Sequence, residues 1–539
     1  YNVAVGYDSL ASNTTASSNT AIGKDALNSN TTASNNTAVG ADALQANTTG
    51  ANNTAVGESA LDQNTTGSHN AAVGTDSLKQ NTTGSNNVAF GHRALEENTT
   101  ANNNTGIGYE ALRENTTGTN NVAVGIGCAL LNTTGSGNTA MGANAFDANT
   151  SGSNNTAVGR GSLGNNTTAS FNTAIGFDSL LSCTSGSSNT GLGKDALKMC
   201  STGTFNTAVG DGALANVTTT SSSTAVGHAA LNVNTAAENT AVGRNALKAN
   251  TSGSKNTAIG YDTLQVQVTG TSNVAVGHDS MRLYTGSNST AIGEGSLSAA
   301  GNGGSGGRNV ALGISALRVN ESGAQNVAAG DTAMLNNTTG DQCVAVGQSA
   351  LKQNTTGDAN TAVGSFCLED NTTASGNTGV GHRCMENTTT GALNVAMGRH
   401  ALTSQTTGGS NVAVGEQCMR QNTTGANCVA VGQGALYNNT TAQHNTAIGF
   451  NSLINTTTGQ NNTGVGSQVM FNNSTGAANT AFGKSALLSN TTASNNTAVG
   501  YDALTQNTTG TSLTAVGASS LDANTTGSSN TAVGINSLG

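Results

Sequence analysis

One 17-residue unit recurs along the whole chain. In the clean copy Asn36–Asn52 it reads Asn-Thr-Ala-Val-Gly-Ala-Asp-Ala-Leu-Gln-Ala-Asn-Thr-Thr-Gly-Ala-Asn, and we number these positions 1 to 17. The glycine at position 5 occurs 32 times between Gly6 and Gly534, and 28 of the 31 intervals equal the length of the unit. Such regularity indicates one structural unit stacked on itself, so we predict a single repeat array over residues 1–539. Because the chain opens and stops inside a unit, we expect a section of a longer fibre.

The unit predicts one coil of a β-solenoid. Its first five residues alternate, with Thr37 and Val39 on one side and Ala38 on the other. Gly40 and the cluster 47–50 are turn signals. We therefore predict an all-β fold, a parallel β-solenoid or β-roll of about 32 stacked coils, which at ~4.8 Å per coil forms a rod. In an alternative, Asp42 caps a single helical turn that ends at Ala46.

Small and apolar residues define the expected core. Position 3 is nearly always Ala, which indicates close approach inside a thin coil or against a neighbouring chain. Positions 4 and 9 hold the two sizeable apolar side chains of each unit. Their burial would contribute about 4 kcal/mol per coil to the free energy of folding. This is far less than the conformational entropy lost when a whole unit becomes ordered. Hydrogen bonds between coils must add stability, and we favour self-association into a homo-oligomer or polymer.

Composition argues against several classes of function. Only 18 Lys and Arg stand against 28 Asp and Glu, with no basic cluster of the kind that binds nucleic acid. The chain has no run of about 18 apolar residues that predicts a membrane span. The seven histidines are scattered, and Asp fills position 7 in nine of 32 units, too few for a regular calcium ladder. We expect no enzyme activity, no cofactor and no metal site.

The repeat is interrupted most strongly in one Gly/Ser-rich coil at 294–312. Its segment Ser298–Gly307 contains an insertion of three residues, which lengthens the spacing from Gly293 to Gly313. Two other units are each one residue shorter than the rest. We predict a bulged loop in this coil, and it is where a local special feature is expected.

The strand motif carries a family resemblance over the whole chain. Asn-Thr-Ala-Val-Gly-x-x-Ala/Ser-Leu resembles the Ser-Val-Ala-Ile-Gly-x-x-Ser repeat of YadA-like trimeric adhesin heads. It is also similar to the Asn-Thr-Ala-x-Gly…Asn-Thr-Thr-Gly repeats of bacterial surface proteins and phage-type tail fibres. The resemblance implies a parallel β-roll on an extracellular fibre, associated as a trimer.

Position 12 begins an Asn-x-Ser/Thr pattern, the acceptor for N-linked glycans, in about two dozen of the 32 units. A second acceptor pattern straddles many unit junctions, as in Asn35-Asn36-Thr37 and Asn52-Asn53-Thr54. The alternative for position 12 is a ladder of stacked amides without sugar. Tyr284, Gln267 and Gln405 in this column favour an outward side chain, whereas Cys183 and Cys200 favour burial. The candidate acceptors are Asn13, Asn30, Asn47, Asn64, Asn81, Asn98, Asn115, Asn132, Asn149, Asn166, Asn250, Asn354, Asn371, Asn422, Asn439, Asn490, Asn507 and Asn524.

The eight cysteines follow the repeat and have no zinc-type spacing, so we interpret them as small apolar replacements. Two pairs lie one coil apart and are candidate disulfides, Cys183–Cys200 and Cys367–Cys384, although adjacent in-register strands fit that bond badly.

These observations favour a structural subunit of an extracellular fibre or filament at a cell or virion surface. It would serve spacing, adhesion or protection and carry covalent glycans on its coils. The alternative is a receptor- or glycan-binding adhesin head or phage-type tail fibre. Ice binding is a minor alternative, because Thr48 and Thr49 are adjacent and point to opposite faces, whereas a flat ice-binding face needs threonines two positions apart.

Overall fold

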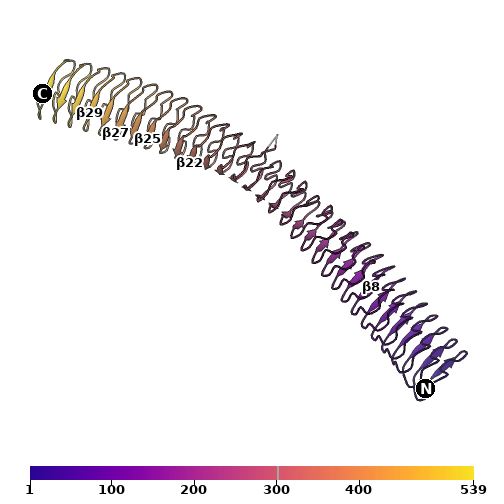
Figure 1. Ribbon diagram of the computed structural model, residues 1–539. Coiled ribbons are helices and arrows are strands. Elements are labelled where there is room, and N and C mark those ends of the chain that lie inside the picture. The colour runs from indigo at the N-terminus through magenta and orange to yellow at the C-terminus, as the bar shows by residue number, and fades with distance from the viewer. Residues whose placement is uncertain (300–302) are drawn as a thin grey trace. The chain divides into compact units, whose positions relative to one another are not determined.

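The structure is a computed structural model that describes residues 1–299 and 303–539. It confirms the predicted fold class, an all-β parallel solenoid of about 31 turns with a 17-residue repeat. Contacts divide the chain into two compact units, Tyr1–Thr269 and Gly270–Gly539. Each is built from the same coil (Figure 1). The predicted bulged loop Ser298–Gly307 lies partly outside the described residues.

The first unit contains sixteen strands of three residues, and each pairs in parallel with the next. They are β1 (Val3–Val5), β2 (Thr20–Ile22), β3 (Thr37–Val39), β4 (Thr54–Val56), β5 (Ala71–Val73), β6 (Val88–Phe90), β7 (Thr105–Ile107), β8 (Val122–Val124), β9 (Thr139–Met141), β10 (Thr156–Val158), β11 (Thr173–Ile175), β12 (Thr190–Leu192), β13 (Thr207–Val209), β14 (Thr224–Val226), β15 (Thr240–Val242) and β16 (Thr257–Ile259).

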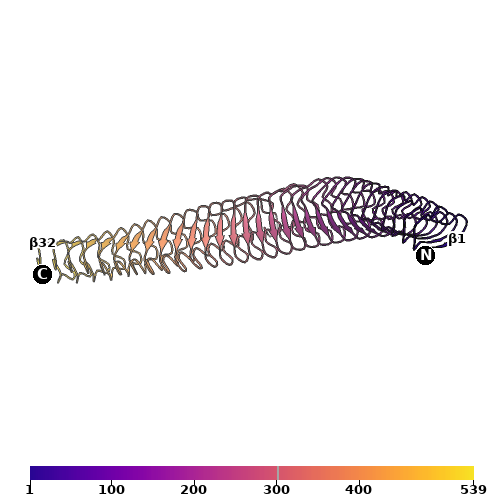
Figure 2. The same ribbon diagram turned by 90° about the horizontal axis from the view of Figure 1, so that it is seen from below.

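The second unit has the same construction (Figure 2). Its strands are β17 (Val274–Val276), β18 (Thr290–Ile292), β19 (Val310–Leu312), β20 (Val327–Ala329), β21 (Val344–Val346), β22 (Thr361–Val363), β23 (Thr378–Val380), β24 (Val395–Met397), β25 (Val412–Val414), β26 (Val429–Val431), β27 (Thr446–Ile448), β28 (Thr463–Val465), β29 (Thr480–Phe482), β30 (Thr497–Val499), β31 (Thr514–Val516) and β32 (Thr531–Val533).

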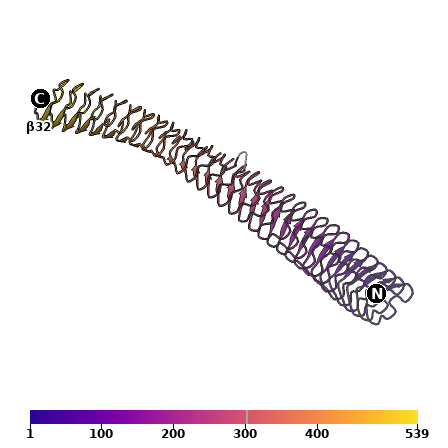
Figure 3. The same cartoon turned by 45° about the horizontal axis from the view of Figure 1, so that its top comes forward.

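Residues of equal position pair across coils, so every side chain stands in a column. Thr37, Ala38 and Val39 pair with the same positions of the next coil. Register survives the irregular spacings, since β14 pairs with β15 and β18 with β19 in the same way. Within each unit the strands follow one another in single file on one side of the coils, and irregular segments return along the other (Figure 3).

The core is thinner than the apolar positions suggest. The central Ala or Gly of every strand from β2 to β32 points inward, and Ala38, Ala43 and Leu44 are fully buried. A methyl group added at Gly106, which replaces the central Ala in β7, would lie 3.2 Å from Leu95 Cγ. Position 3 therefore packs against the position 9 Leu inside a thin coil. Position 4 points outward instead, so only one of the two large apolar positions fills the core.

The alternative of a helical turn at Asp42–Ala46 is wrong. The backbone alternates there, with left-handed φ of +59° at Asp42 and +53° at Leu44, and no helix forms in the described part of the chain. The alternation turns amides toward neighbouring coils. The Asp42 N–H donates to the Lys24 carbonyl at 2.8 Å, and the Leu44 N–H donates to the Ala60 carbonyl at 3.0 Å. These bonds between coils replace the i to i+4 bonds of a helix.

Candidate functional site

The asparagines at position 12 form a ladder of amides along the coils. The Nδ2 of Asn64 donates to Oδ1 of Asn47 at 2.8 Å, and the Nδ2 of Asn81 donates to Oδ1 of Asn64 at 2.8 Å. The same Nδ2 of Asn64 also donates to the carbonyl of Gly67 in its own turn at 3.0 Å. Both hydrogens of the amide are thus engaged, and both links recur in coil after coil.

This geometry fits the amide-ladder alternative for position 12 and leaves no free Nδ2 hydrogen for the sugar alternative. An N-linked glycan replaces one Nδ2 hydrogen by a sugar carbon, and both hydrogens of a ladder amide are used inside a buried turn. Only Asn13 and Asn524 of the predicted acceptors are partly exposed. The others have no exposed surface and fit the alternative of an amide ladder; they are Asn30, Asn47, Asn64, Asn81, Asn98, Asn115, Asn132, Asn149, Asn166, Asn250, Asn354, Asn371, Asn422, Asn439, Asn490 and Asn507.

Other residues in the position 12 column are buried as well. Tyr284, Gln267 and Gln405 are fully buried, so their size does not indicate an outward column. The Tyr284 hydroxyl lies 2.6 Å from Ser289 Oγ and donates to the Gly306 carbonyl at 2.5 Å. Burial raises the pKa of Tyr284 to about 12. Tyr284 and Gln405 are accepted inward because the Tyr284 hydroxyl donates to the Gly306 carbonyl and the Gln405 Nε2 donates to the Gly408 carbonyl.

The ladder stops wherever another residue replaces Asn. The coil after Asn439 has Thr456 in this column, and the buried Oδ1 of Asn439 has no hydrogen-bond partner in the described structure. The same holds for Oδ1 of Asn166, which is followed by Cys183. Each interruption leaves an amide oxygen buried without a donor, which is costly in a protein interior.

A second set of asparagines, at position 1, closes each coil. The Nδ2 of Asn36 donates to the Gly50 carbonyl at 2.9 Å, which also accepts from Asn47 at 3.0 Å. The Oδ1 of Asn36 accepts the backbone N–H of Asn53 in the next coil at 2.8 Å. We did not foresee this role from the sequence. The signal was present, because position 1 is Asn in most units although it directly precedes a strand, where Asn is disfavoured.

The asparagines at position 17 lie on the outside. This column includes Phe171, Phe205 and Leu393, whose side chains are 63%, 67% and 66% exposed. Asn35 and Asn52 in the same column are also exposed, each with a left-handed φ near +60°. The junction acceptor pattern is therefore presented to solvent, whereas the position 12 pattern is not.

All eight cysteines are buried free thiols, and neither predicted disulfide is present. Cys183 and Cys200 occupy the ladder column, where burial raises their pKa to about 12 and about 11. A hydrogen bond with the Cys384 thiol, together with burial, raises the pKa of Cys367 far above its usual value. In-register positions of stacked parallel coils do not present two Cβ atoms with the dihedral geometry that a disulfide needs.

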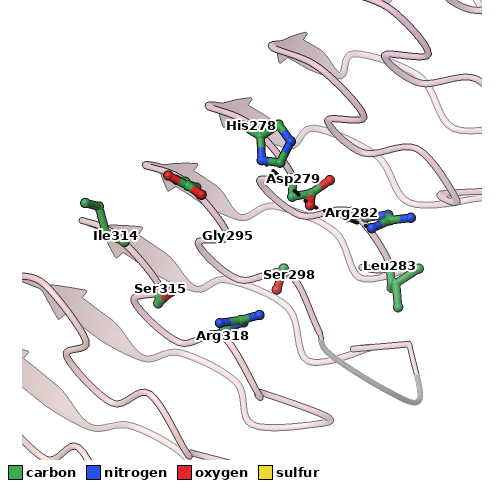
Figure 4. A pocket seen from close by; sticks show the side chains of 10 residues that line it. His278, Asp279, Arg282, Leu283, Gly295, Ser298, Ile314, Ser315 and Arg318 are labelled. Carbon is green, nitrogen blue, oxygen red and sulfur yellow. Dashed lines mark ion pairs between the residues drawn. The ribbon is translucent and has the colours of Figure 1, made fainter.

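A hollow of about 320 Å³ opens beside the irregular coil (Figure 4). Its middle coil has Gly295 and Ser298, small residues between the larger side chains of the coils before and after it. Arg282 and Arg318 flank it. Asp279 forms an ion pair with Arg282 at 3.6 Å, and the Nδ1 of His278 lies 3.7 Å from the same carboxylate. A second hollow, of about 230 Å³, forms at Gly161 and Gly164 for the same reason: these glycines lack side chains, whereas the coils before and after them have larger residues.

The outer face of the sheet has an apolar column at position 4. Val, Ile, Leu, Met or Phe occupies it in every one of the 32 described strands except β20, which has Ala329. Ile107 is 38% exposed and Phe90 is 57% exposed. Two residues earlier, position 2 adds a parallel column of Thr and Val, with Ala71 in β5, on the same face. The face is a continuous apolar stripe within each unit.

The described residues bring together no group of three or more His, Cys, Asp or Glu side chains fit to hold a metal ion. None of their segments forms a helix long and apolar enough to cross a membrane. No protein-family model matches the chain, and a search of curated proteins finds no match.

Proposed function

We propose that the chain is a structural segment of an extracellular fibre, and that copies of it associate through the outer face of the β-sheet. The apolar stripe at position 4 carries the proposal. Soluble monomers rarely expose a continuous apolar patch larger than a few hundred Å², and larger patches are typical of interaction surfaces. Sixteen coils at ~4.8 Å make this stripe about 75 Å long within one unit.

The core supports the same conclusion. Because Val39 and its equivalents point outward, each coil buries little more than Ala and one Leu. Burial of the stripe between copies would add about 25 cal/mol for every Å² of apolar surface removed from water. Association thus supplies the hydrophobic stabilisation that a single coil lacks.

Sedimentation of the purified full chain tests the proposal. We expect an oligomer at micromolar concentration. Replacing Val39 and Val73 with Lys places charges in the stripe and should shift the chain to monomers. The matched control replaces Thr49 and Thr83, exposed residues of the turn column, with Lys and should leave the oligomer intact. A wild-type chain that is monomeric at these concentrations would contradict the proposal.

The second candidate function, binding of an acidic glycan, rests on the hollow at Arg282 and Arg318. Guanidinium groups on either side suit a carboxylate or sulfate, and Asp279 can accept hydrogen bonds from sugar hydroxyls. A glycan array probed with the wild-type chain and with the Arg318→Ala variant tests it. Binding that is unchanged in the variant would remove the hollow as its site.

A further inference from the structure

Seven asparagines of the exposed position 17 column combine the acceptor sequence for N-linked glycans with an accessible amide. In each, the residue two places later is the outward-facing Thr that begins a strand. They are Asn35, Asn52, Asn103, Asn154, Asn288, Asn461 and Asn495, and all are exposed. We propose that these seven residues, and not the buried position 12 asparagines, are the N-glycosylation sites of the chain. The inference rests on the extracellular placement in the proposed function.

The backbone presents these amides outward. Asn35 has φ of +63° and Asn495 has φ of +62°, the left-handed conformation that Asn tolerates better than most residues. It turns the side chain away from the coil just before the strand starts. The side chains of Asn35, Asn154, Asn461 and Asn495 form no hydrogen bond within residues 1–299 and 303–539, so sugar on Nδ2 breaks no contact of the fold.

The hydroxyl group at the third residue separates this column from the acceptor patterns that start at position 11, except Asn216-Val217-Thr218, in which the Asn216 Nδ2 donates to the Asn232 Oδ1 at 2.9 Å. A pattern that starts at position 11, such as Asn165-Asn166-Thr167, also has an exposed Asn. Its Thr167 hydroxyl, however, donates to the Thr184 carbonyl of the next coil at 3.1 Å. The junction pattern Asn35-Asn36-Thr37 has its Thr hydroxyl on the outer face of the sheet, and no hydrogen bond of that hydroxyl is found among the described residues.

The reaction needs a donor from the secretion machinery, a lipid-linked oligosaccharide. A bond forms between Nδ2 of the asparagine and the anomeric carbon of the first sugar. The bond from that carbon to the phosphate oxygen of the lipid pyrophosphate breaks. The lipid pyrophosphate leaves, and Nδ2 loses one proton to solvent. The amide keeps one of its two hydrogens. The exposed asparagines can lose the other without breaking a contact of the fold, whereas the ladder asparagines use both in hydrogen bonds.

The chain contains its own controls. Asn86, Asn120 and Asn427 are exposed in the same column, but the residue two places later is Val. They share the conformation and exposure of the seven candidates and lack only the hydroxyl. The sixteen buried ladder asparagines have the acceptor sequence but lack exposure and a free Nδ2 hydrogen. Together the two sets separate the effect of sequence from the effect of structure.

Glycopeptide mass spectrometry of the full chain, purified from the cells that secrete it, tests the proposal. We expect sugar at the seven junction sites and none at Asn86, Asn120, Asn427 or the buried ladder residues. Absence of sugar from all seven sites, or sugar on buried ladder asparagines, would overturn it.

Two exchanges sharpen the experiment. Thr37→Val should reduce occupancy of Asn35 to background, and Val88→Thr should create a new site at Asn86. Both residues occur naturally at position 2, so the fold tolerates either one. Retention of sugar at Asn35 in the first variant would contradict the assignment. The two proposals can fail separately. A chain that carries sugar but sediments as a monomer contradicts the proposed association and leaves the glycosylation sites in place.

Discussion

Asparagine has three separate roles in one coil, and its column decides which role it has. At position 1, the Nδ2 of Asn36 donates to the Gly50 carbonyl of its own turn, and its Oδ1 accepts the backbone N–H of Asn53 in the next coil. At position 12, Asn47 bonds the amides above and below it. At position 17, Asn52 is exposed. Buried amides are retained here because each finds partners in its own coil and in the neighbouring coils.

Completing the amide ladder should stabilise the chain. Thr456→Asn places an amide between Asn439, whose Oδ1 lacks a donor, and Asn473 in the following coil. Two new hydrogen bonds at about 1 kcal/mol each should raise the free energy of unfolding by about 2 kcal/mol. Urea denaturation measures the change. Thr458→Asn, at an exposed position of the same turn, should have no effect, and an equal gain from it would contradict the ladder explanation.

The buried thiols should be unreactive in the folded chain. Burial raises the pKa of Cys128 from 9.0 to about 12, so at pH 8 almost all of it is the neutral thiol. Alkylation by iodoacetamide should be at least about a hundredfold slower than in guanidinium, where the thiol has its ordinary pKa of 9.0. Rapid labelling of the folded chain at pH 8 would show that the coils open.

The same thiols make stability depend on pH. A thiol whose pKa is higher in the folded state contributes fully below pH 9.0 and loses this contribution as the pH rises toward about 12, because only the unfolded chain can ionise it. Urea midpoints between pH 8 and pH 11 should therefore fall.

Among the local elements, the strands and the positions of the turns were predictable, and the conformation of the segment after Gly40 was not. The alternation of Thr37, Ala38 and Val39 predicts that Ala38 lies on the face opposite to the other two, and β3 confirms this. It does not predict which face is inward: the small Ala38 is buried, whereas the larger Val39, expected in the core, points outward. The segment after Gly40 resembles a helix start in sequence, yet it alternates left- and right-handed residues. Leu44 with positive φ is unfavourable alone, and only hydrogen bonds to adjacent coils compensate for it. Such bonds are absent from a single unit read by itself.

The glycine that ends each strand should be irreplaceable. Gly57 has φ of +138°, and a Cβ there would lie 2.6 Å from the carbonyl carbon of Gly74 in the next coil. Gly57→Ala should cost at least about 2 kcal/mol, because it combines backbone strain with a contact to rigid backbone. Denaturation is compared with Gly409→Ala at position 16, where φ is not left-handed, where the nearest atom to an added Cβ is the Ala392 carbonyl oxygen at 3.1 Å, and where alanine occurs naturally, as at Ala51. Equal losses in the two variants would contradict a special role for position 5.

For the molecule as a whole, register between coils matters more than the length of any one coil. The interval from Gly227 to Gly243 is one residue shorter than the repeat, yet Thr224 pairs with Thr240 in register. The interval from Gly293 to Gly313 is three residues longer than the repeat, and Thr290 pairs with Val310. The strands keep their pairing although the lengths of the segments between them differ. The repeat period therefore predicts the fold, whereas the acceptor pattern alone does not predict the site, because exposure depends on which turn carries it.

Removal of one whole coil should leave the stack intact. Deleting residues 54–70 joins Asn53 to Ala71, so Asn53 takes the place of Asn70, which donates to the Gly84 carbonyl at 2.9 Å. Every column of equivalent side chains then runs unbroken across the deletion. Because the stability of a repeat array is approximately a sum of terms for single coils and for neighbouring pairs, the urea midpoint should barely change. Deleting only residues 62–70 instead removes the returning segment that contains Asn64. The remaining residues are too few to lead the chain from the end of β4 back to the start of β5. Hydrogen-exchange protection should then be lost in both strands. If the deletion of the whole coil is as disruptive as the partial one, the coils are not interchangeable units.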